Sequence, residues 1–186
     1  RFVFFSRAVL ESAKTLDLRP QIVHSHDWHT GLIPVYLKTA YASEPSFQET
    51  ATLFTIHNLG YQGIFWHYDW HLLNLPWDYF SHEALEFYGK INFLKGGLVF
   101  ADALSTVSPR YAKEIQTAAY GHRVEGVLRK RRKDLFGILN AIDTEEWDPS
   151  RDPCIVSAYD AKAIQGKEKC KAALQKELGL PVQKDV

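Results

Sequence analysis

Residues 52–63 read TLFTIHNLGYQG, and this stretch decides the fold class. The five residues 52–56 are apolar or β-branched, and the run ends abruptly at His57 on residues typical of a loop. A short and nearly continuous apolar run is typical of a strand that is buried on both faces, as in a parallel sheet. The sequence therefore predicts a buried strand at 52–56 that ends on a polar loop.

The same pattern occurs at three other places along the chain. Apolar runs at 22–23, 103–107 and 135–139 lead into His24, Ser108 and Asn140. Between the runs, the spacing of apolar residues predicts helices at about 29–41, 90–101 and 109–118. Strands that alternate with helices indicate an α/β domain with a largely parallel sheet.

Local signals refine two of these helices. Ser108 is a good N-cap, and Pro109 suits the first helical position. The pair Gly96 and Gly97 has the look of a phosphate-binding glycine loop, but it lies inside the helical pattern of 90–101. We therefore interpret the two glycines as a place where the helix packs closely against a neighbour.

The character of the chain changes near residue 150. The segment 150–186 begins with an Asp-Pro pair typical of a linker and continues, from about residue 166, as a charged amphipathic helix that Gly179 is suited to end. We predict one domain over residues 1–149, followed by a linker and a helix over 150–186.

The composition argues against several functions. Acidic and basic residues balance at 22 each, so neither nucleic acid nor an anionic membrane is indicated as a partner. The basic run 129–133 has no interleaved aromatics and is interpreted as a solvated helix face. The two cysteines form no CxxC pair, which indicates free thiols in a reducing compartment. The sequence has no Met and begins at Arg1, from which we expect a piece of a longer protein.

Polar, aromatic and glycine residues are concentrated where the predicted strands end. In open α/β sheets, ligands bind at the carboxyl ends of the strands. These ends carry HSHDWH at 24–29, HNLGYQG at 57–63, and Asn140. The sequence therefore predicts a ligand-binding cleft built from these three segments.

The histidines His24, His26 and His29 also permit a metal hypothesis. Neutral imidazoles beside a carboxylate are good zinc ligands, and the segment partly resembles the HxHxDH signature of metallo-β-lactamase-like hydrolases. The order differs, because Asp27 precedes Trp28 rather than the last histidine, and no clear set of further ligands follows. We predict no metal site, and interpret Asp27 as the N-cap of a helix that begins at Trp28.

Several long phrases together resemble one family. VHSHDWHTGL, FTIHNLGYQGIF, EFYGKINFLKGGLVFAD, TVSPRYAKEI and GILNAIDTEEWDPSRDP are similar to phrases of the bacterial glycogen synthases and plant starch synthases, in the family's order and over roughly residues 10–180. The resemblance implies a GT-B glycosyltransferase, in which two Rossmann-like domains face a cleft. It implies that residues 1–149 are the later part of the N-terminal Rossmann-like domain and that 150–186 lead to the C-terminal domain. It implies transfer of glucose from ADP-glucose to the nonreducing end of an α-1,4-glucan, with retention of configuration. It also implies that no metal or cofactor is needed and that the enzyme is cytoplasmic, or plastidic in a plant.

The resemblance also assigns residues to the cleft. Its implied substrate-binding residues are Asp27, Trp28, His29, Asn58, Tyr61 and Asn140. His57 is the implied catalytic residue, which orients the transferred glucose and holds its own carbonyl near the reacting carbon. Such a fixed polar group stabilises the positive charge that builds up on the anomeric carbon.

The sequence departs from the family in two places. Ala141 replaces the glycine of the usual LNGID phrase, and Arg123 stands where a GYGL-like phrase has glycine. The KxGGL loop that contacts the nucleotide and the second domain are not in this sequence, so we expect the chain alone to be inactive. An alternative hypothesis is a glucan-binding module without catalysis, which would use the aromatic lobe at 65–80 with Trp66, Trp70 and Trp77.

Overall fold

The computed structural model describes residues 1–185. The chain divides into two compact units, the first of which is Arg1–Asn140 and the second of which begins at Ala141. Val186, the last residue of the predicted linker and helix, lies outside the described residues. No helix within the described part of the chain is both long and apolar enough to cross a bilayer.

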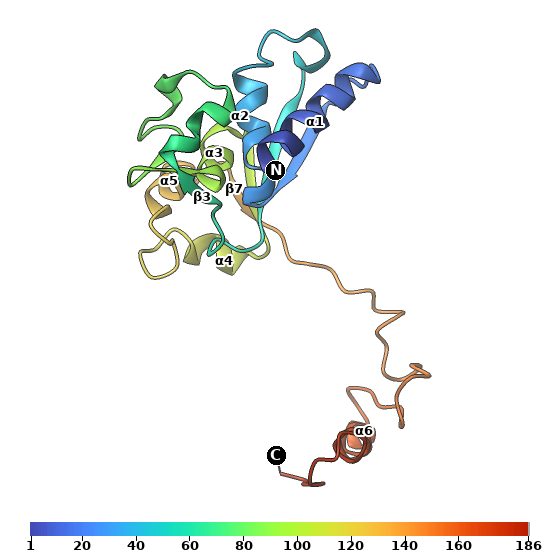
Figure 1. The fold of residues 1–186 in the computed structure, drawn as a ribbon. Helices are drawn as coiled ribbons and strands as arrows, with labels where there is room; N and C mark the ends of the chain where they lie inside the picture. Colours follow the sequence, from blue (N-terminus) through green and yellow to red (C-terminus); the bar gives the residue numbers. More distant parts are fainter. Residues whose placement is uncertain (186) are drawn as a thin grey trace. The chain divides into compact units, whose positions relative to one another are not determined.

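A four-stranded parallel sheet forms the centre of the first unit (Figure 1). Its strands, in spatial order, are β1 (Ile22–His26), β2 (Ala51–Ile56), β6 (Ala103–Thr106) and β7 (Leu135–Gly137). Each strand overlaps a predicted apolar run, although β1 continues through His24 to His26 and β7 ends at Gly137, two residues before the predicted end. The predicted α/β fold with a parallel sheet is confirmed. Phe54 and Ile56 of β2 are fully buried, as expected for a strand inside the sheet.

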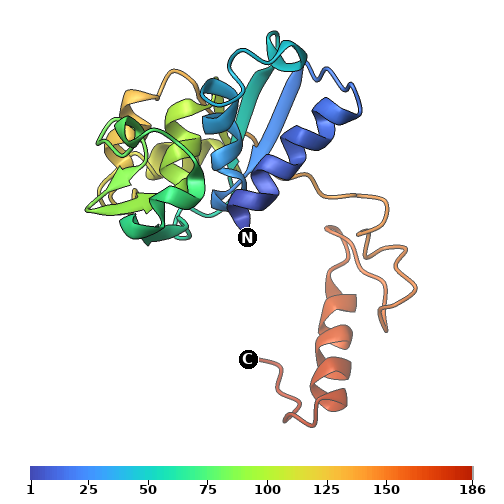
Figure 2. The ribbon, with the colours of Figure 1, turned by 45° about the horizontal axis from the view of Figure 1, so that its top comes forward.

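Helices pack around this sheet. They are α1 (Phe2–Thr15), α2 (Leu32–Lys38), α3 (Phe93–Phe100), α4 (Pro109–Glu114) and α5 (Glu125–Lys130). In Figure 2 the helix α1 lies beside β1, and α2 packs against both α1 and α3. Ser108 caps α4 as predicted, because its Oγ accepts a hydrogen bond of 2.9 Å from the backbone N–H of Tyr111.

A long connection between β2 and α3 adds a small antiparallel sheet. Its strands, in spatial order, are β3 (Ile64–Trp66), β5 (Lys90–Asn92) and β4 (Glu86–Phe87). The same connection contains the 3₁₀ helices η3 (His67–Leu73) and η4 (Trp77–Tyr79), while η1 (Trp28–Thr30) and η2 (Pro45–Phe47) lie earlier in the chain.

Three predicted helices are shorter than expected, and the one predicted at 109–118 ends at Glu114. The one predicted at 90–101 begins only at Phe93, because residues 90–92 pair with β3 and Asn92 caps α3 through its Oδ1, 2.9 Å from the backbone N of Lys95. The one predicted at 29–41 consists of the single 3₁₀ turn η1 followed by α2.

The two glycines of α3 serve close packing, as predicted. A Cβ on Gly97 would lie 2.5 Å from the ring of Phe54 in β2, and a Cβ on Gly96 would lie 3.0 Å from Val35 in α2. Real Cβ atoms do not approach neighbours this closely without a shift of structure. Glycine at both positions therefore lets α3 approach the sheet and α2.

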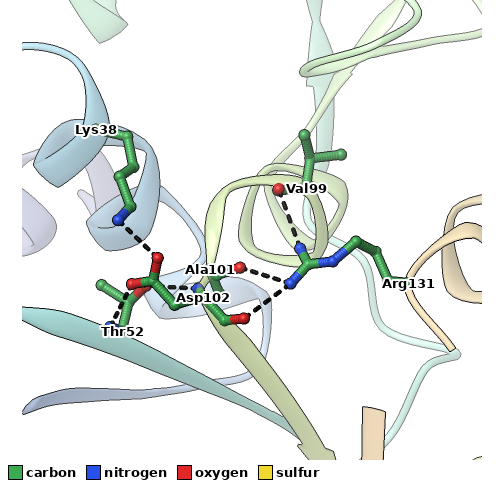
Figure 3. Close-up of polar contacts among 6 residues, drawn as sticks. All are labelled: Lys38, Thr52, Val99, Ala101, Asp102 and Arg131. Carbon is green, nitrogen blue, oxygen red and sulfur yellow. Dashed lines mark hydrogen bonds and ion pairs between the residues drawn. The ribbon is translucent and has the colours of Figure 1, made fainter. Parts of the chain in front are cut away.

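The interpretation of 129–133 as a solvated face is wrong for Arg131. Its guanidinium donates hydrogen bonds to the carbonyls of Leu98, Val99, Ala101 and Asp102, where α3 ends and β6 begins. Figure 3 shows the guanidinium directed at this turn. Basic groups are favoured there because the last carbonyls of a helix lack intrahelical partners. The sequence could not show this, because Arg131 and the end of α3 are about thirty residues apart.

The carboxylate of Asp102 ties the same turn to two other elements. It accepts hydrogen bonds from Lys38 Nζ in α2 at 2.7 Å and from the backbone N and Oγ1 of Thr52 in β2 at 2.7 and 2.8 Å (Figure 3). Burial acts to raise the pKa of Asp102, but the bonds from Lys38 and Thr52 outweigh it, and the pKa is lowered. This network fixes the start of β2, whose other end carries the predicted site.

The second unit contains one helix, α6 (Gln165–Glu177), among its described residues. Gly179 adopts a φ of +66°, and the chain ends the helix with two backbone bonds, Gly179 N to Lys176 O and Leu180 N to Gln175 O. These two bonds form a Schellman motif. The predicted helix and its glycine terminator are confirmed.

Candidate active site

The strands β1 and β2 end side by side, which brings the two predicted loops together. His26, the last residue of β1, is in register with Thr55, the second-last residue of β2. The residues that follow the two strands, Asp27 and His57, therefore lie at the same edge of the sheet. Oδ1 of Asp27 accepts a hydrogen bond from the backbone N of His57 at 2.8 Å and a longer one from Asn58 N at 3.4 Å. The carboxylate of Asp27 therefore holds the start of the loop that contains His57.

The interpretation of Asp27 as a helix cap is wrong. Asp27 does occupy the position before η1, but its side chain makes no capping hydrogen bond there. The backbone of Asp27 has a φ of 54° and a ψ of 179°, a conformation that non-glycine residues rarely adopt. In this conformation the carboxylate reaches across to β2 rather than back to its own helix.

This carboxylate occupies the place of a backbone carbonyl in the ladder between the strands. At the start of the pair, Ala51 N donates to Gln21 O, an offset of 51 − 21 = 30 residues. At the end of the pair, His57 N donates to Asp27 Oδ1, an offset of 57 − 27 = 30. The parallel ladder is thus extended by one side-chain bond, which carries its regular spacing into the loop.

His57 presents its remaining polar groups at this edge. Its ring Nε2 lies 3.1 Å from Nδ1 of His26, and both side chains are exposed. No backbone or side-chain hydrogen bond within residues 1–185 ends on the carbonyl oxygen of His57. That carbonyl and the ring Nδ1 are therefore available to a ligand.

The rest of the loop is internally anchored. The Oδ1 of Asn58 accepts a hydrogen bond of 2.9 Å from Gly60 N, which forms a tight turn and leaves the amide Nδ2 free to donate. Leu59 is fully buried, and its backbone N donates to the hydroxyl of Tyr111 in α4 at 3.1 Å. Tyr61 is exposed at the end of the turn.

Trp28 forms a wall next to this loop. Gly63 adopts a φ of +62°, and a Cβ there would lie only 2.2 Å from Cε3 of the Trp28 ring. His29 lies along the indole of Trp28, with ring centroids 4.0 Å apart and planes inclined by 30°. The aromatic face of Trp28 and the 57–63 loop are thus in direct contact through Gly63.

A hollow of about 500 Å³ opens beside the 60–64 segment, and Trp28 and Tyr61 are the predicted site residues that line it, whereas Asp27, His57 and Asn58 do not. Its lining residues are Trp28, Gly60, Tyr61, Gln62, Gly63, Ile64, Phe87, His122 and Arg123. A larger hollow of about 860 Å³ runs along α1, but none of the predicted site residues lines it. We place the candidate site at the strand ends, where the hydrogen-bonding groups converge.

The sequence did not predict the part that residues 121–123 play in this hollow. Gln62 Nε2 donates to the carbonyl of His122 at 2.9 Å, which joins this segment to the 57–63 loop. His122 and Arg123 have φ angles of 47° and 69°, and the guanidinium of Arg123 lies over the ring of Tyr88 at 5.3 Å. The one sequence feature that could have indicated this segment is Arg123, which stands where the family phrase has glycine. A φ of 69° is a conformation that glycine adopts at little cost.

The other predicted residues lie apart from this group. Asn140 follows β7, which is two strands away from β2, and no described contact joins it to His57. For the metal hypothesis, His24 Nε2 is bound to Thr55 Oγ1 at 2.6 Å, while the His29 ring lies on Trp28. The described residues contain no group of three side chains suited to hold a metal ion, so the three histidines do not converge.

The aromatic lobe is divided between core and surface. Trp70 is only 6% exposed, and its Nε1 donates to the carbonyl of Leu75 at 3.1 Å, so it cannot contact a glucan. Trp66 is 67% exposed, with the ring of Tyr68 at 6.0 Å, and Trp77 is also exposed. A glucan-binding surface on this lobe would therefore consist of Trp66, Tyr68 and Trp77.

Comparison with known proteins places the chain in a family. Residues 1–130 match the family model described as the starch synthase catalytic domain. A glycogen synthase of Thermotoga maritima is 54% identical over 183 residues, which cover 98% of this chain and 38% of that protein. A glycogen synthase of Anaeromyxobacter sp. is 52% identical over 186 residues, which cover all of this chain and 39% of that protein.

A solved structure supports the same placement. The catalytic domain of starch synthase IV from Arabidopsis thaliana, bound to ADP and acarbose, aligns with a TM-score of 0.82 at 35% identity. The alignment covers 96% of this chain and 37% of the other. The chain thus spans less than two fifths of the length of the relatives it matches.

Proposed function

This chain belongs to the starch synthase catalytic domain family, and on that premise we propose that the whole protein is a glucosyltransferase of the glycogen and starch synthase type. It transfers glucose from ADP-glucose to the nonreducing end of an α-1,4-glucan and retains the anomeric configuration. The bond from the anomeric carbon to the diphosphate breaks, and ADP leaves with the electron pair. The new bond forms to an acceptor hydroxyl on the same face of the sugar, and the proton of that hydroxyl passes to the departing diphosphate.

The observation that carries this proposal is the bond from Asp27 to the backbone of His57. It extends the regular ladder into the loop, and no hydrogen bond among residues 1–185 ends on the His57 carbonyl. An oxocarbenium-like transition state carries positive charge at the anomeric carbon, and a dipole fixed in advance stabilises such charge without having to reorganise. In the proposed mechanism, the His57 carbonyl is that dipole.

The neighbouring groups suit a sugar. The free Nδ2 of Asn58 can donate to a sugar hydroxyl, while the Tyr61 ring can stack on a pyranose face. Trp28 supplies a second aromatic wall to the hollow. The Arabidopsis domain was solved with ADP and acarbose, which supports an ADP-linked donor as the ligand of this family's cleft.

The test uses the full-length protein with His57→Ala, and His71→Ala as the matched control. His71 is also an exposed histidine, but it lies in η3 and binds only the carbonyl of Tyr68. His57→Ala keeps the backbone carbonyl and removes the imidazole, so this variant tests the ring. We expect it to lower glucosyl transfer by about 100-fold, because the transferred glucose loses the side chain that orients it. Both variants should unfold at the wild-type temperature. Full turnover by a folded His57→Ala protein would refute the role given to His57.

A further inference from the structure

The His57 ring has a neighbour whose role the proposed function leaves open. His26 is the last residue of β1, and its Nδ1 lies 3.1 Å from Nε2 of His57. The two ring centroids are 5.3 Å apart, and the ring planes are inclined by 39°. Since the two residues come from different strands, the sheet register that pairs His26 with Thr55 sets this contact.

The His26 ring is itself supported from inside the sheet. His24 and His26 point to the same face of β1, because side chains alternate along a strand, and their ring centroids are 4.1 Å apart. His24 Nε2 bonds to Thr55 Oγ1 at 2.6 Å, and Thr55 Oγ1 bonds to Ser105 Oγ at 2.6 Å. Thr55 and Ser105 are buried, so these hydrogen bonds anchor the stacked rings of His24 and His26 to the core of the sheet.

The consecutive residues His26 and Asp27 therefore contact different groups of His57. Asp27 binds the backbone N of His57, while His26 binds the ring. With Nε2 engaged, Nδ1 is the ring nitrogen that remains for a ligand. A bond between two neutral imidazoles contains one donor and one acceptor, so the tautomer of one ring determines the tautomer of the other.

We propose that His26 is a positioning residue for His57, which fixes the rotamer and the tautomer of its ring so that Nδ1 faces the transferred glucose. This inference rests on the proposed function, since it assigns the ring of His57 a task in that reaction. The surroundings of His26 favour its neutral form. Burial first, and then the neighbouring His24 and His57, lower the pKa of His26, against the opposing effect of Asp27.

The experiment compares His26→Ala and His26→Asn in the full-length protein. Alanine removes the contact, whereas the Asn amide keeps a polar atom near the position of Nδ1. His71→Ala again serves as the distant control. Two readouts are taken: kcat and KM for ADP-glucose, and the ¹⁵N chemical shifts of the His57 ring without substrate, which report its tautomer.

We expect His26→Ala to lower kcat by about 3- to 10-fold, as for the loss of one net hydrogen bond, with KM nearly unchanged. The ¹⁵N shifts of His57 should move toward a mixture of tautomers. His26→Asn should recover most of kcat, because its amide keeps a hydrogen-bonding partner for Nε2 of His57. Wild-type kcat together with unchanged ¹⁵N shifts in His26→Ala, or in His26→Phe if the alanine variant does not fold, would overturn the proposal, because neither side chain has a polar atom that could replace Nδ1. The ¹⁵N readout requires no turnover, so it is independent of the proposed function, whose failure would appear as full activity in His57→Ala.

Discussion

The Oδ1 of Asp27 lies 2.8 Å from the backbone N of His57, at the point where two parallel strands end. The bond repeats the 30-residue offset of the ladder before it, with a side chain in place of a carbonyl. It also requires Asp27 to adopt a φ of 54°, which is unfavourable for a residue with a Cβ. The strained backbone of Asp27 and the position of His57 therefore depend on each other.

Replacement of Asp27 tests this coupling. Asp27→Ala removes the acceptor, and we expect kcat to fall by about 10- to 100-fold, because a hydrogen bond to a charged group is lost. Asp27→Asn is the control for backbone strain, since Asn tolerates positive φ and keeps a neutral acceptor; its loss should be smaller. Steady-state kinetics on the full-length protein give the answer. Equal rates for wild type and Asp27→Ala would remove Asp27 from the site.

The contact between Gly63 and Trp28 can be separated from backbone strain by a pair of alanine variants. Gly63 and Gly89 have φ values of +62° and +76°, but only a Cβ at Gly63 would meet the Trp28 ring, while Gly89 faces open space. We expect Gly89→Ala to cost about 1 kcal/mol from strain alone. Gly63→Ala should cost about 1–3 kcal/mol more, from overpacking. Chemical denaturation measures both, and equal losses would mean that Trp28 moves aside freely.

Arg131 is predicted to stabilise the turn between α3 and β6. Arg131→Ala leaves the carbonyls at the end of α3 without their charged donor, and we expect a loss of about 2–3 kcal/mol in unfolding free energy. Arg129 is the matched control, because it belongs to the same basic run but is exposed. Arg129→Ala should change stability by less than about 0.5 kcal/mol. A similar effect of both variants in thermal unfolding would contradict the role of Arg131.

Asp102 is predicted to contribute an acid-sensitive part of the stability. Its pKa is lower in the folded protein than in the unfolded chain, so the folded state favours the ionised form. The stabilisation is complete above the unfolded pKa of about 3.9 and is lost as the pH falls through the lower folded pKa. Asp102→Asn should therefore be less stable than wild type at pH 7, and the difference should shrink below about pH 4. A difference that does not depend on pH would disprove the ion-pair contribution.

The exposed aromatic residues test the alternative of a glucan-binding surface. If Trp66 and its neighbour Tyr68 bind glucan, Trp66→Ala should weaken glycogen affinity by about 3- to 10-fold, as for the loss of one aromatic stacking partner. Trp147 is similarly exposed but lies outside the lobe, and Trp147→Ala is the control. Co-sedimentation with glycogen measures both. Unaltered affinity in Trp66→Ala would exclude this surface.

Much of the fold could be predicted because it follows from local patterns. Apolar runs that end on polar residues located the four strands of the parallel sheet, since burial on both faces leaves a continuous apolar signature. The cap at Ser108 and the glycine terminator of α6 were predictable because their partners lie within a few residues. Where the partner was distant, prediction failed: residues 90–92 form a strand because they pair with 64–66, and not because of their own spacing.

The sequence by itself determined the parallel α/β sheet and placed His57 and Asp27 after the carboxyl ends of two strands, while the structure showed that these strands are neighbours. Only the tertiary structure decided that Asp27 holds the backbone of His57 rather than capping a helix, and that His26 meets the His57 ring. The physical reason is that these bonds join residues about thirty positions apart and depend on one backbone angle at Asp27. Local periodicity reports which side of a segment is apolar, but it carries no information on where a polar side chain finds its partner.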